Sequence, residues 1–205
     1  MAVPAPLTQT VNGWLRVVPP WTLYVLGALY MGWLFWRAAT DVALVEPIDW
    51  LERAYGLASL QLLVATLAVT PLRRFAGLNL LRFRRALGLL VFFFVLAHLL
   101  VWALLDVQAL GAVWADIVKR PYVTIGMAAF LLLVPLAVTS NDRSLRRLGG
   151  AVWRKLHKLT YAVAVLGAIH YVWLARGFAL EPLVYMGLIA GLLALRLPAP
   201  RAAAA

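Results

Sequence analysis

The chain has 205 residues, of which 64% are hydrophobic and 13% are charged, and its mean hydropathy is +0.88. Soluble domains are about half apolar and about one quarter charged, so this composition excludes an ordinary soluble domain and indicates a membrane protein. The length accommodates about five to seven helical spans and leaves no room for an appended catalytic domain of ~100 residues. Because the chain has no cysteine, iron–sulfur clusters, disulfides and thiolate metal sites are excluded.

Residues 1–20 contain several prolines and no continuous apolar core, so we expect no cleavable signal peptide but an N-terminal cytoplasmic segment. A membrane domain is expected over 21–197 and a disordered tail over 198–205. Runs such as LLVFFFVLAHLLVWALL lack the period-two alternation of a membrane β-barrel, so the expected fold is an all-α, polytopic helical bundle. Six transmembrane helices are expected, at Trp21–Trp36, Ala54–Leu72, Ala86–Leu105, Tyr122–Thr139, Val152–Ala175 and Leu183–Leu197.

The charged residues divide between the two sides of this expected bundle. The connections after the second and fourth spans hold most of the arginines, with Asp142 as their one acid, whereas the other connections hold the remaining acids. By the positive-inside rule the basic side and both termini are cytoplasmic. The net charge of +11 is therefore a topology signal, and we expect membrane lipid and no nucleic acid as its partner.

The three histidines, His98, His157 and His170, each lie within or at the edge of an expected span. An ionisable side chain at membrane depth is costly, so each is a functional candidate by default. His98 lies 13 residues beyond Arg85 and His170 lies 15 residues beyond Lys155, which places both about 20 to 22 Å from the cytoplasmic boundary. Two histidines at one depth on different helices suit the axial positions of a b-type haem. The alternatives are two unrelated core histidines and a zinc site that lacks a third ligand.

His157 precedes His170 by 13 residues, about 20 Å along a helix, which is a suitable spacing for a second haem stacked across the bilayer. The two rings do not share a face of an ideal helix, however, and the third span offers only arginines where a partner for His157 is needed. Its interpretations as a ligand and as an interfacial cation both stay open. Near it are candidate contacts for a haem propionate, a flavin phosphate or a lipid head group: Arg84, Arg85, Lys155 and Lys158.

Nucleotide-binding and hydrolase motifs such as GxGxxG, a Walker loop, HExxH and GxSxG are absent from the sequence, so any electrons that the chain moves must arrive from a partner. A different class of function is a membrane transporter whose buried histidines relay protons. It calls for acids at mid-membrane, and no acid lies inside the six expected stretches. A self-sufficient metal or quinone reductase would need a nucleotide-binding domain, which is absent, or a quinone site.

The stretch from about residue 55 to 196 resembles the MsrQ (formerly YedZ) family of haem-binding membrane subunits. The resemblance is collinear and includes all three histidines. This family belongs with the ferric-reductase and NADPH-oxidase transmembrane domains. The resemblance implies haem b on His98 and His170 and His157 as the candidate ligand of a second haem. The oxidase relatives use two histidines on each of two helices, whereas the third span here has one. The resemblance rests on ATLAVTPLRRF (65–75), RRALGLLVFFFVLAHLLVWALLD (84–106), KRPYVTIGMAAFLLLVPLAVTSND (119–142), WRKLHKLTYAVAVLGAIHYVW (153–173) and PLVYMGLIAGLLALR (182–196).

The resemblance also implies a function. Such subunits lie in the bacterial inner membrane and pass electrons to MsrP, a periplasmic molybdopterin enzyme that reduces methionine sulfoxide in oxidised periplasmic proteins. The implied electron source is the quinone pool or a cytosolic flavin reductase, and FMN is associated with the family. The chain is then an electron-transfer subunit, and the catalytic step belongs to its partner.

Overall fold

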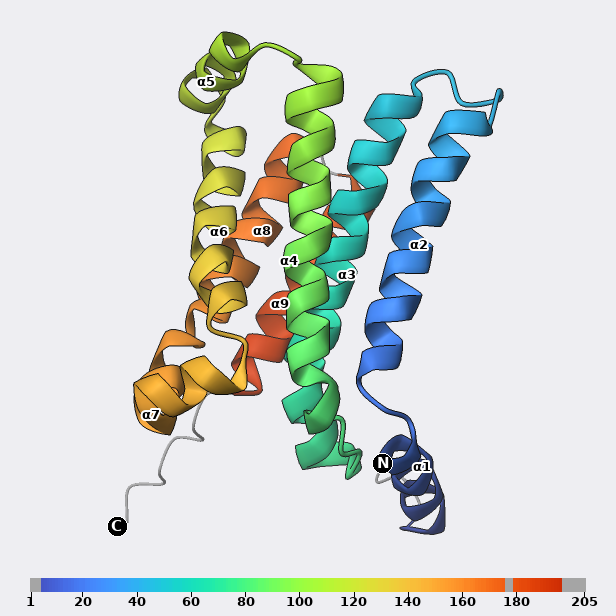
Figure 1. The fold of residues 1–205 in the computed structure, drawn as a ribbon, viewed down its shortest axis with the longest axis vertical. Coiled ribbons are helices and arrows are strands. Elements are labelled where there is room, and N and C mark those ends of the chain that lie inside the picture. Colours follow the sequence, from blue (N-terminus) through green and yellow to red (C-terminus); the bar gives the residue numbers. More distant parts are fainter. Residues whose placement is uncertain (1–4, 176–178, 197–205) are drawn as a thin grey trace.

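A computed structural model describes residues 5–175 and 179–196, and in these residues all of the regular structure is helical (Figure 1). The bundle consists of six apolar helices, and three further helices, α1, α5 and α7, lie at its two ends. The bundle helices are α2 (Trp21–Thr40), α3 (Pro47–Ala76), α4 (Arg84–Leu100), α6 (Pro121–Val138), α8 (Leu159–Leu174) and α9 (Leu180–Ala194). The end helices are α1 (Ala5–Val17), α5 (Leu110–Lys119) and α7 (Asp142–Leu156). A 3-10 turn (Leu81–Phe83) precedes α4, and a π-helical turn (Val101–Asp106) continues it.

Local sequence signals explain where the helices begin and end. Pro47 and Pro121 open α3 and α6, at a position where the missing N–H of proline costs nothing. Gly77 ends α3 in the left-handed conformation, with φ 69°, which glycine adopts without strain. Asn141 caps α7, because its side chain accepts a hydrogen bond of 2.8 Å from the backbone N–H of Ser144.

The expected all-α membrane bundle is confirmed. Three helical stretches are long and apolar enough to cross a membrane, namely Pro47–Ala76, Leu81–Asp106 and Pro121–Val138. The pair α1 and α2 meets the same criterion when taken together, although the two helices are bent by 80° relative to each other. The helices α8 and α9 are apolar but shorter.

The expected starts of the second and fifth spans differ most from the structure and were wrong. The second span was expected from Ala54, but α3 begins at Pro47, so the helix also contains Asp49 and Glu52. The six expected stretches still contain no acid, but α3 and α9 extend beyond theirs and carry Asp49, Glu52 and Glu181 within their first two turns at the acidic end. The fifth span was expected at Val152–Ala175, but the chain turns at His157 and α8 begins only at Leu159. The cause is amphipathic sequence: residues 153–156 (WRKL) have apolar residues three apart with two basic residues between them, and they form the last turn of the surface helix α7. The expected end of the sixth span at Leu197 and the tail over 198–205 lie outside the described residues.

The alternating directions of the helices gather opposite charges at the two ends of the bundle. The helices α1 and α7 and the connection from α3 to α4 lie at one end, the lower one in Figure 1, which we call the basic end. The connection from α2 to α3 and helix α5 lie at the other, acidic end. Charged residues of the basic end are Arg16, Arg73, Arg74, Arg82, Arg84, Arg85, Asp142, Arg143, Arg146, Arg147, Arg154, Lys155, Lys158 and Arg196. Those of the acidic end are Arg37, Asp41, Glu46, Asp49, Glu52, Arg53, Asp106, Asp116, Lys119, Arg120 and Glu181.

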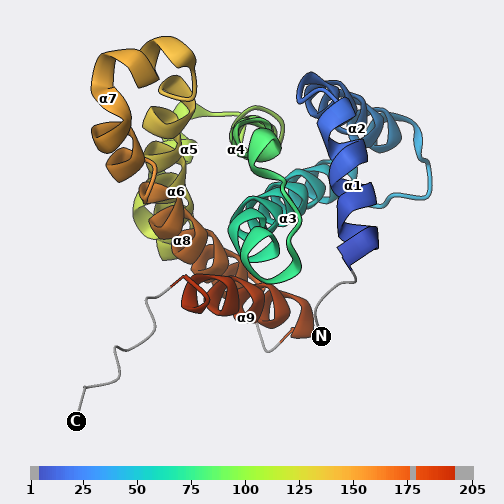
Figure 2. The same cartoon turned by 90° about the horizontal axis from the view of Figure 1, so that it is seen from below.

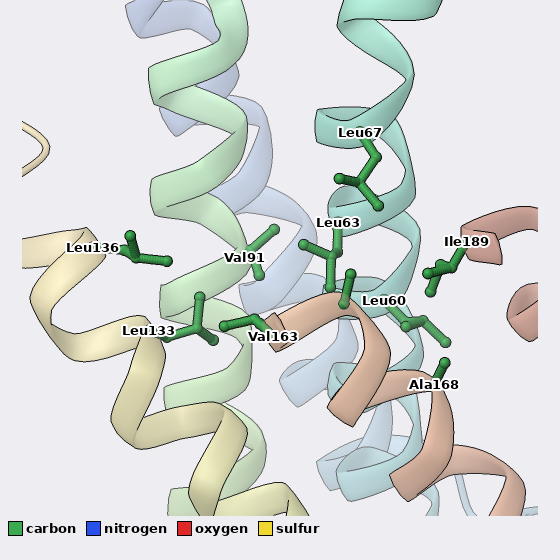
Figure 3. Close-up of a cluster of buried hydrophobic side chains, with 10 residues drawn as sticks. Leu60, Leu63, Leu67, Val91, Leu133, Leu136, Val163, Ala168 and Ile189 are labelled. Carbon is green, nitrogen blue, oxygen red and sulfur yellow. The ribbon is translucent and has the colours of Figure 1, made fainter. Parts of the chain in front are cut away.

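The core lies between two tightly packed helix pairs. Helix α3 packs chiefly against α4 and helix α6 against α8, and α2 and α9 cover the outside (Figure 2). One buried cluster joins α3, α4, α6, α8 and α9 (Figure 3); it consists of Leu60, Leu63, Leu67, Val91, Leu133, Leu136, Val163, Ala164, Ala168 and Ile189. A second cluster joins α2, α3 and α4 and consists of Leu34, Leu51, Tyr55, Ala58, Leu90, Phe94 and Val101. The helices α4 and α8, which belong to different pairs, have little direct backbone contact.

Candidate functional site

The two histidines expected at one depth meet across the gap between the helix pairs. His98 of α4 and His170 of α8 have their ring centroids 6.3 Å apart, with the ring planes at 79°. Both rings line a cavity of about 800 Å³. This volume is in the range of cofactor sites, which is about 300–1,000 Å³. The structure therefore brings together the pair that the sequence pointed to.

Each histidine ring is oriented by a carbonyl group from a helix other than its own. The Nδ1 atom of His98 lies 2.9 Å from the carbonyl oxygen of Glu52 in α3, and that of His170 lies 2.7 Å from the carbonyl oxygen of Tyr122 in α6. A carbonyl oxygen can only accept, so Nδ1 of each ring carries the hydrogen and donates it. In both rings Nε2 is then the unprotonated nitrogen, which is the form that binds a metal.

A glycine makes room for each ring. A Cβ atom at Gly56 would lie 3.2 Å from Nδ1 of His98, and one at Gly126 would lie 2.9 Å from Nδ1 of His170. Each glycine comes four residues after the accepting residue, so that the carbonyl group and the gap lie on the same helix face. The settings of the two histidines are thus equivalent. We did not predict these glycines, because a glycine in an apolar helix more often serves helix packing.

The separation of the rings fits a single metal ion between them. Metal–imidazole bonds are about 2.0–2.1 Å long and the bonding nitrogen is about 1.1 Å from the ring centroid, so two axial imidazoles place their centroids about 6–6.5 Å apart. The described residues contain no group of three or more His, Cys, Asp or Glu side chains able to hold a metal ion. Two histidines are too few for a zinc site, whereas haem iron needs only axial ligands from the protein. The donor set therefore fits a haem.

The surroundings of the ring pair change from apolar in the bundle to charged at the acidic end. Deep in the bundle the cavity is lined by Leu63, Val91, Leu133 and Val163. Towards the acidic end, Arg53 and Arg120 line it, and each is already paired with an acid of its own helix turn, at 2.8 and 3.2 Å respectively. The π-helical turn after His98 turns the buried Trp102 into the same cavity wall. Such wide turns occur often at functional sites.

His157 lies apart from this pair, in the connection between α7 and α8 at the basic end. Its ring stacks on Trp153, with centroids 3.8 Å apart, and its Nε2 lies 3.2 Å from Oγ1 of Thr139. Trp153 in turn donates from Nε1 to the carbonyl oxygen of Thr139 at 2.9 Å. Burial, together with the nearby charges of Arg84 and Arg85, lowers the pKa of His157 below its ordinary value. The ring is therefore uncharged at neutral pH.

The four basic residues predicted as cofactor contacts lie near His157 and not near the ring pair. Arg84 opens α4, and Arg85 forms an ion pair of 2.7 Å with Asp142. Lys155 is in the last turn of α7, and Lys158 immediately precedes α8. None of the four lines the cavity of His98 and His170. The structure thus separates the predicted site residues into two groups at the two ends of the bundle.

Comparison with known proteins identifies the family of the chain. Residues 54–168 match the family described as Ferric reductase like transmembrane component. A protein from Rhizobium meliloti (strain 1021) is 46% identical over 86% of this chain and 82% of its own length. Proteins from Brucella anthropi and Agrobacterium fabrum are 43% and 44% identical, over 89% and 88% of this chain and 83% and 84% of their own lengths. All three are named "Protein-methionine-sulfoxide reductase heme-binding subunit MsrQ", and no solved structure matches the chain. The chain belongs to the MsrQ family and, with it, to the ferric-reductase-like transmembrane components.

Proposed function

We propose that this chain is the electron-transfer subunit of a methionine sulfoxide reductase system and that it holds haem b between His98 and His170. The observation that carries the proposal is the ring pair itself: two imidazoles 6.3 Å apart, each with Nδ1 bonded to a carbonyl group and Nε2 left for the metal. The names of the relatives, which are called heme-binding subunits, support it.

The residues of this chain have three tasks in such a site. His98 and His170 hold the iron, and the carbonyl groups of Glu52 and Tyr122 fix the tautomer and direction of each ring. The apolar wall excludes water, which keeps the local dielectric constant low. The haem itself supplies a one-electron carrier when it is bound.

The proposed orientation places six spans in the bacterial inner membrane, with both termini in the cytoplasm. The concentration of arginines at the basic end supports it, because basic loops stay on the cytoplasmic side. His98 lies eight residues before Asp106 at the acidic end, so the haem lies near the periplasm. A periplasmic molybdopterin enzyme of the MsrP type then receives the electrons and catalyses sulfoxide reduction for the repair of oxidised proteins.

The electron donor is proposed to be the quinone pool or a cytosolic flavin reductase, with FMN as a further cofactor of the system. His157 is the proposed ligand of a second haem at the basic end. To bind iron, its Nε2 atom has to leave Oγ1 of Thr139, which is 3.2 Å away. The number of haems bound per chain tests this part of the proposal.

The experiment that tests the proposal is a reduced-minus-oxidised visible spectrum with haem quantitation on the purified protein. We expect a low-spin b-type spectrum that is lost in His98→Ala and in His170→Ala. The His157→Ala variant decides the stoichiometry: the haem content halves if His157 holds a second haem and is unchanged if it does not. A wild-type protein that is folded but colourless after expression with haem supplied refutes the proposal and favours the proton-relay transporter.

A further inference from the structure

Helix α1 lies across the basic end of the bundle and not along it (Figure 2). It is bent by 80° relative to α2, which runs the length of the bundle. Its apolar side chains Leu7, Val11 and Trp14 are exposed and, with spacings of four and three residues, share one face of the helix. An amphipathic helix that is nearly perpendicular to the spans and exposes an apolar face is typical of the boundary between lipid head groups and acyl chains. The face therefore places α1 at the level of the head groups.

Another face of α1 is bonded to the connection between α3 and α4. Asn12 donates from its side-chain amide to the carbonyl oxygen of Gly77 at 3.0 Å and accepts from the backbone N–H of Asn79 at 2.9 Å. Arg82 donates from Nη1 to the carbonyl oxygen of Leu15 in α1 at 3.1 Å. These hydrogen bonds hold the surface helix and the connection in a fixed relative position.

A hollow of about 570 Å³ lies between the two segments, apart from the cavity of the two histidines. Its charged lining consists of three exposed arginines: Arg16 in the last turn of α1, Arg73 in the last turn of α3, and Arg82 in the connection. In the described part of the chain no carboxylate forms an ion pair with any of them, and Asp142, the acid of the basic end, is paired with Arg85 at 2.7 Å. The hollow therefore gathers positive charge that the described residues do not compensate.

The three arginines differ in how their donors are used. Nη1 of Arg82 donates to the carbonyl oxygens of Leu15 and Arg16, so this side chain has a structural task. No hydrogen bond or ion pair between described residues engages the guanidinium groups of Arg16 and Arg73. A guanidinium group presents a fork of N–H donors that matches the oxygens of a phosphate group. Two such forks, on different helices, thus face one hollow.

We propose that this hollow binds the phosphate group of an anionic phospholipid. Arg16 and Arg73 donate charge-assisted hydrogen bonds to the phosphate oxygens, and Arg82 adds its charge while it holds α1 in place. The apolar face of α1 favours a lipid over a soluble anion, because it places the hollow at head-group level and leaves the acyl chains beside the exposed side chains of the helix. The site does not depend on a haem between His98 and His170.

The test is native mass spectrometry of the detergent-purified full chain, with phosphatidylglycerol and phosphatidylcholine supplied at equal concentrations. We expect the wild type to retain phosphatidylglycerol preferentially, because the choline group of the other lipid cancels the charge of its phosphate. Arg16→Gln and Arg73→Gln should each reduce this preference about fivefold, which is the contribution of one basic residue near an anionic head group. Neither variant removes a hydrogen bond that holds α1, so thermal unfolding and the haem spectrum should stay unchanged.

The matched controls are Arg143→Gln and Arg147→Gln in α7, which remove the same charge from exposed positions of the same end but outside the hollow. They should leave the preference for phosphatidylglycerol unchanged. Equal losses in the controls and in Arg16→Gln and Arg73→Gln mean that general attraction to the basic end explains the binding, and this overturns the proposal. A wild type that retains both lipids equally overturns it as well. Displacement of the lipid by glycerol 3-phosphate overturns the assignment to a lipid, because the hollow then binds soluble phosphate esters.

Discussion

The sharpest test of the ring geometry is the substitution Gly126→Ala in α6. The new Cβ atom would lie 2.9 Å from Nδ1 and 3.0 Å from Cε1 of His170, so the ring has to move by about 0.5 Å to reach an ordinary contact of 3.4 Å. That movement disturbs the hydrogen bond of 2.7 Å to the carbonyl oxygen of Tyr122, which sets the ring direction. Losing the group that orients a metal-binding histidine costs about 10- to 100-fold in metal affinity, or about 1.4–2.7 kcal/mol.

The assay is haem content per chain, with the low-spin spectrum and the midpoint potential of the fraction that retains haem. Gly56→Ala should have a smaller effect, because its Cβ atom would lie 3.2 Å from Nδ1 of His98. Gly88→Ala is the control: Gly88 is in the same helix as His98, and a Cβ atom there meets nothing within 4 Å. Full haem content and an unchanged spectrum in Gly126→Ala would show that the close approach of His170 to Gly126 does not position the ligand, and would refute this reasoning.

Two further predictions concern the orientation and the bundle. Since the chain has no native cysteine, single variants Val42→Cys and Arg147→Cys should react with a membrane-impermeant maleimide from opposite sides, the first from the periplasm; labelling of both from one side contradicts the proposed topology. Arg196 donates to the carbonyl group of Leu67, which Pro71 leaves without its helical partner. Arg196→Leu should lower the thermal unfolding temperature in detergent, because the carbonyl group of Leu67 loses its hydrogen-bond donor, which destabilises the fold by about 1–3 kcal/mol. In a Pro71→Ala background that loss should shrink, because the helix then satisfies the carbonyl group itself, and an equal loss in both backgrounds contradicts this.

The features that could be predicted from the sequence are those that follow from apolar side chains and from the regular rise of a helix. Apolar runs identified the bundle helices, and histidines counted from basic residues identified the depth that His98 and His170 share. Both arguments work because helical rise is regular and because burying polar groups in a membrane is costly. The same regularity misled at His157, where counting assumed one continuous helix from Val152, whereas the chain turns there and places a surface helix before α8.

The features that the sequence did not reveal depend on the main chain and on tertiary contacts. A carbonyl group accepts a hydrogen bond whatever side chain it carries, so nothing in the sequence marked Glu52 or Tyr122 as partners of the histidines. Likewise, Gly56 and Gly126 differ from the other glycines of apolar helices only through the rings that approach them. The hydrogen bond from Arg196 to Tyr161 joins residues 35 positions apart, and no spacing rule connects them.

Because the partners of Nδ1 are main-chain carbonyl groups, the site should tolerate side-chain changes at the accepting residues and resist them at the glycines. Tyr122→Phe removes only a hydroxyl that lies 3.3 Å from Nη1 of Arg120, and the carbonyl group that accepts from His170 is unaffected. We therefore expect wild-type haem content and an unchanged spectrum in Tyr122→Phe, against a clear loss in Gly126→Ala one helical turn away. If Tyr122→Phe loses as much haem as Gly126→Ala, then the tyrosine side chain, and not its backbone, positions the ligand, and the settings of His98 and His170 are not equivalent.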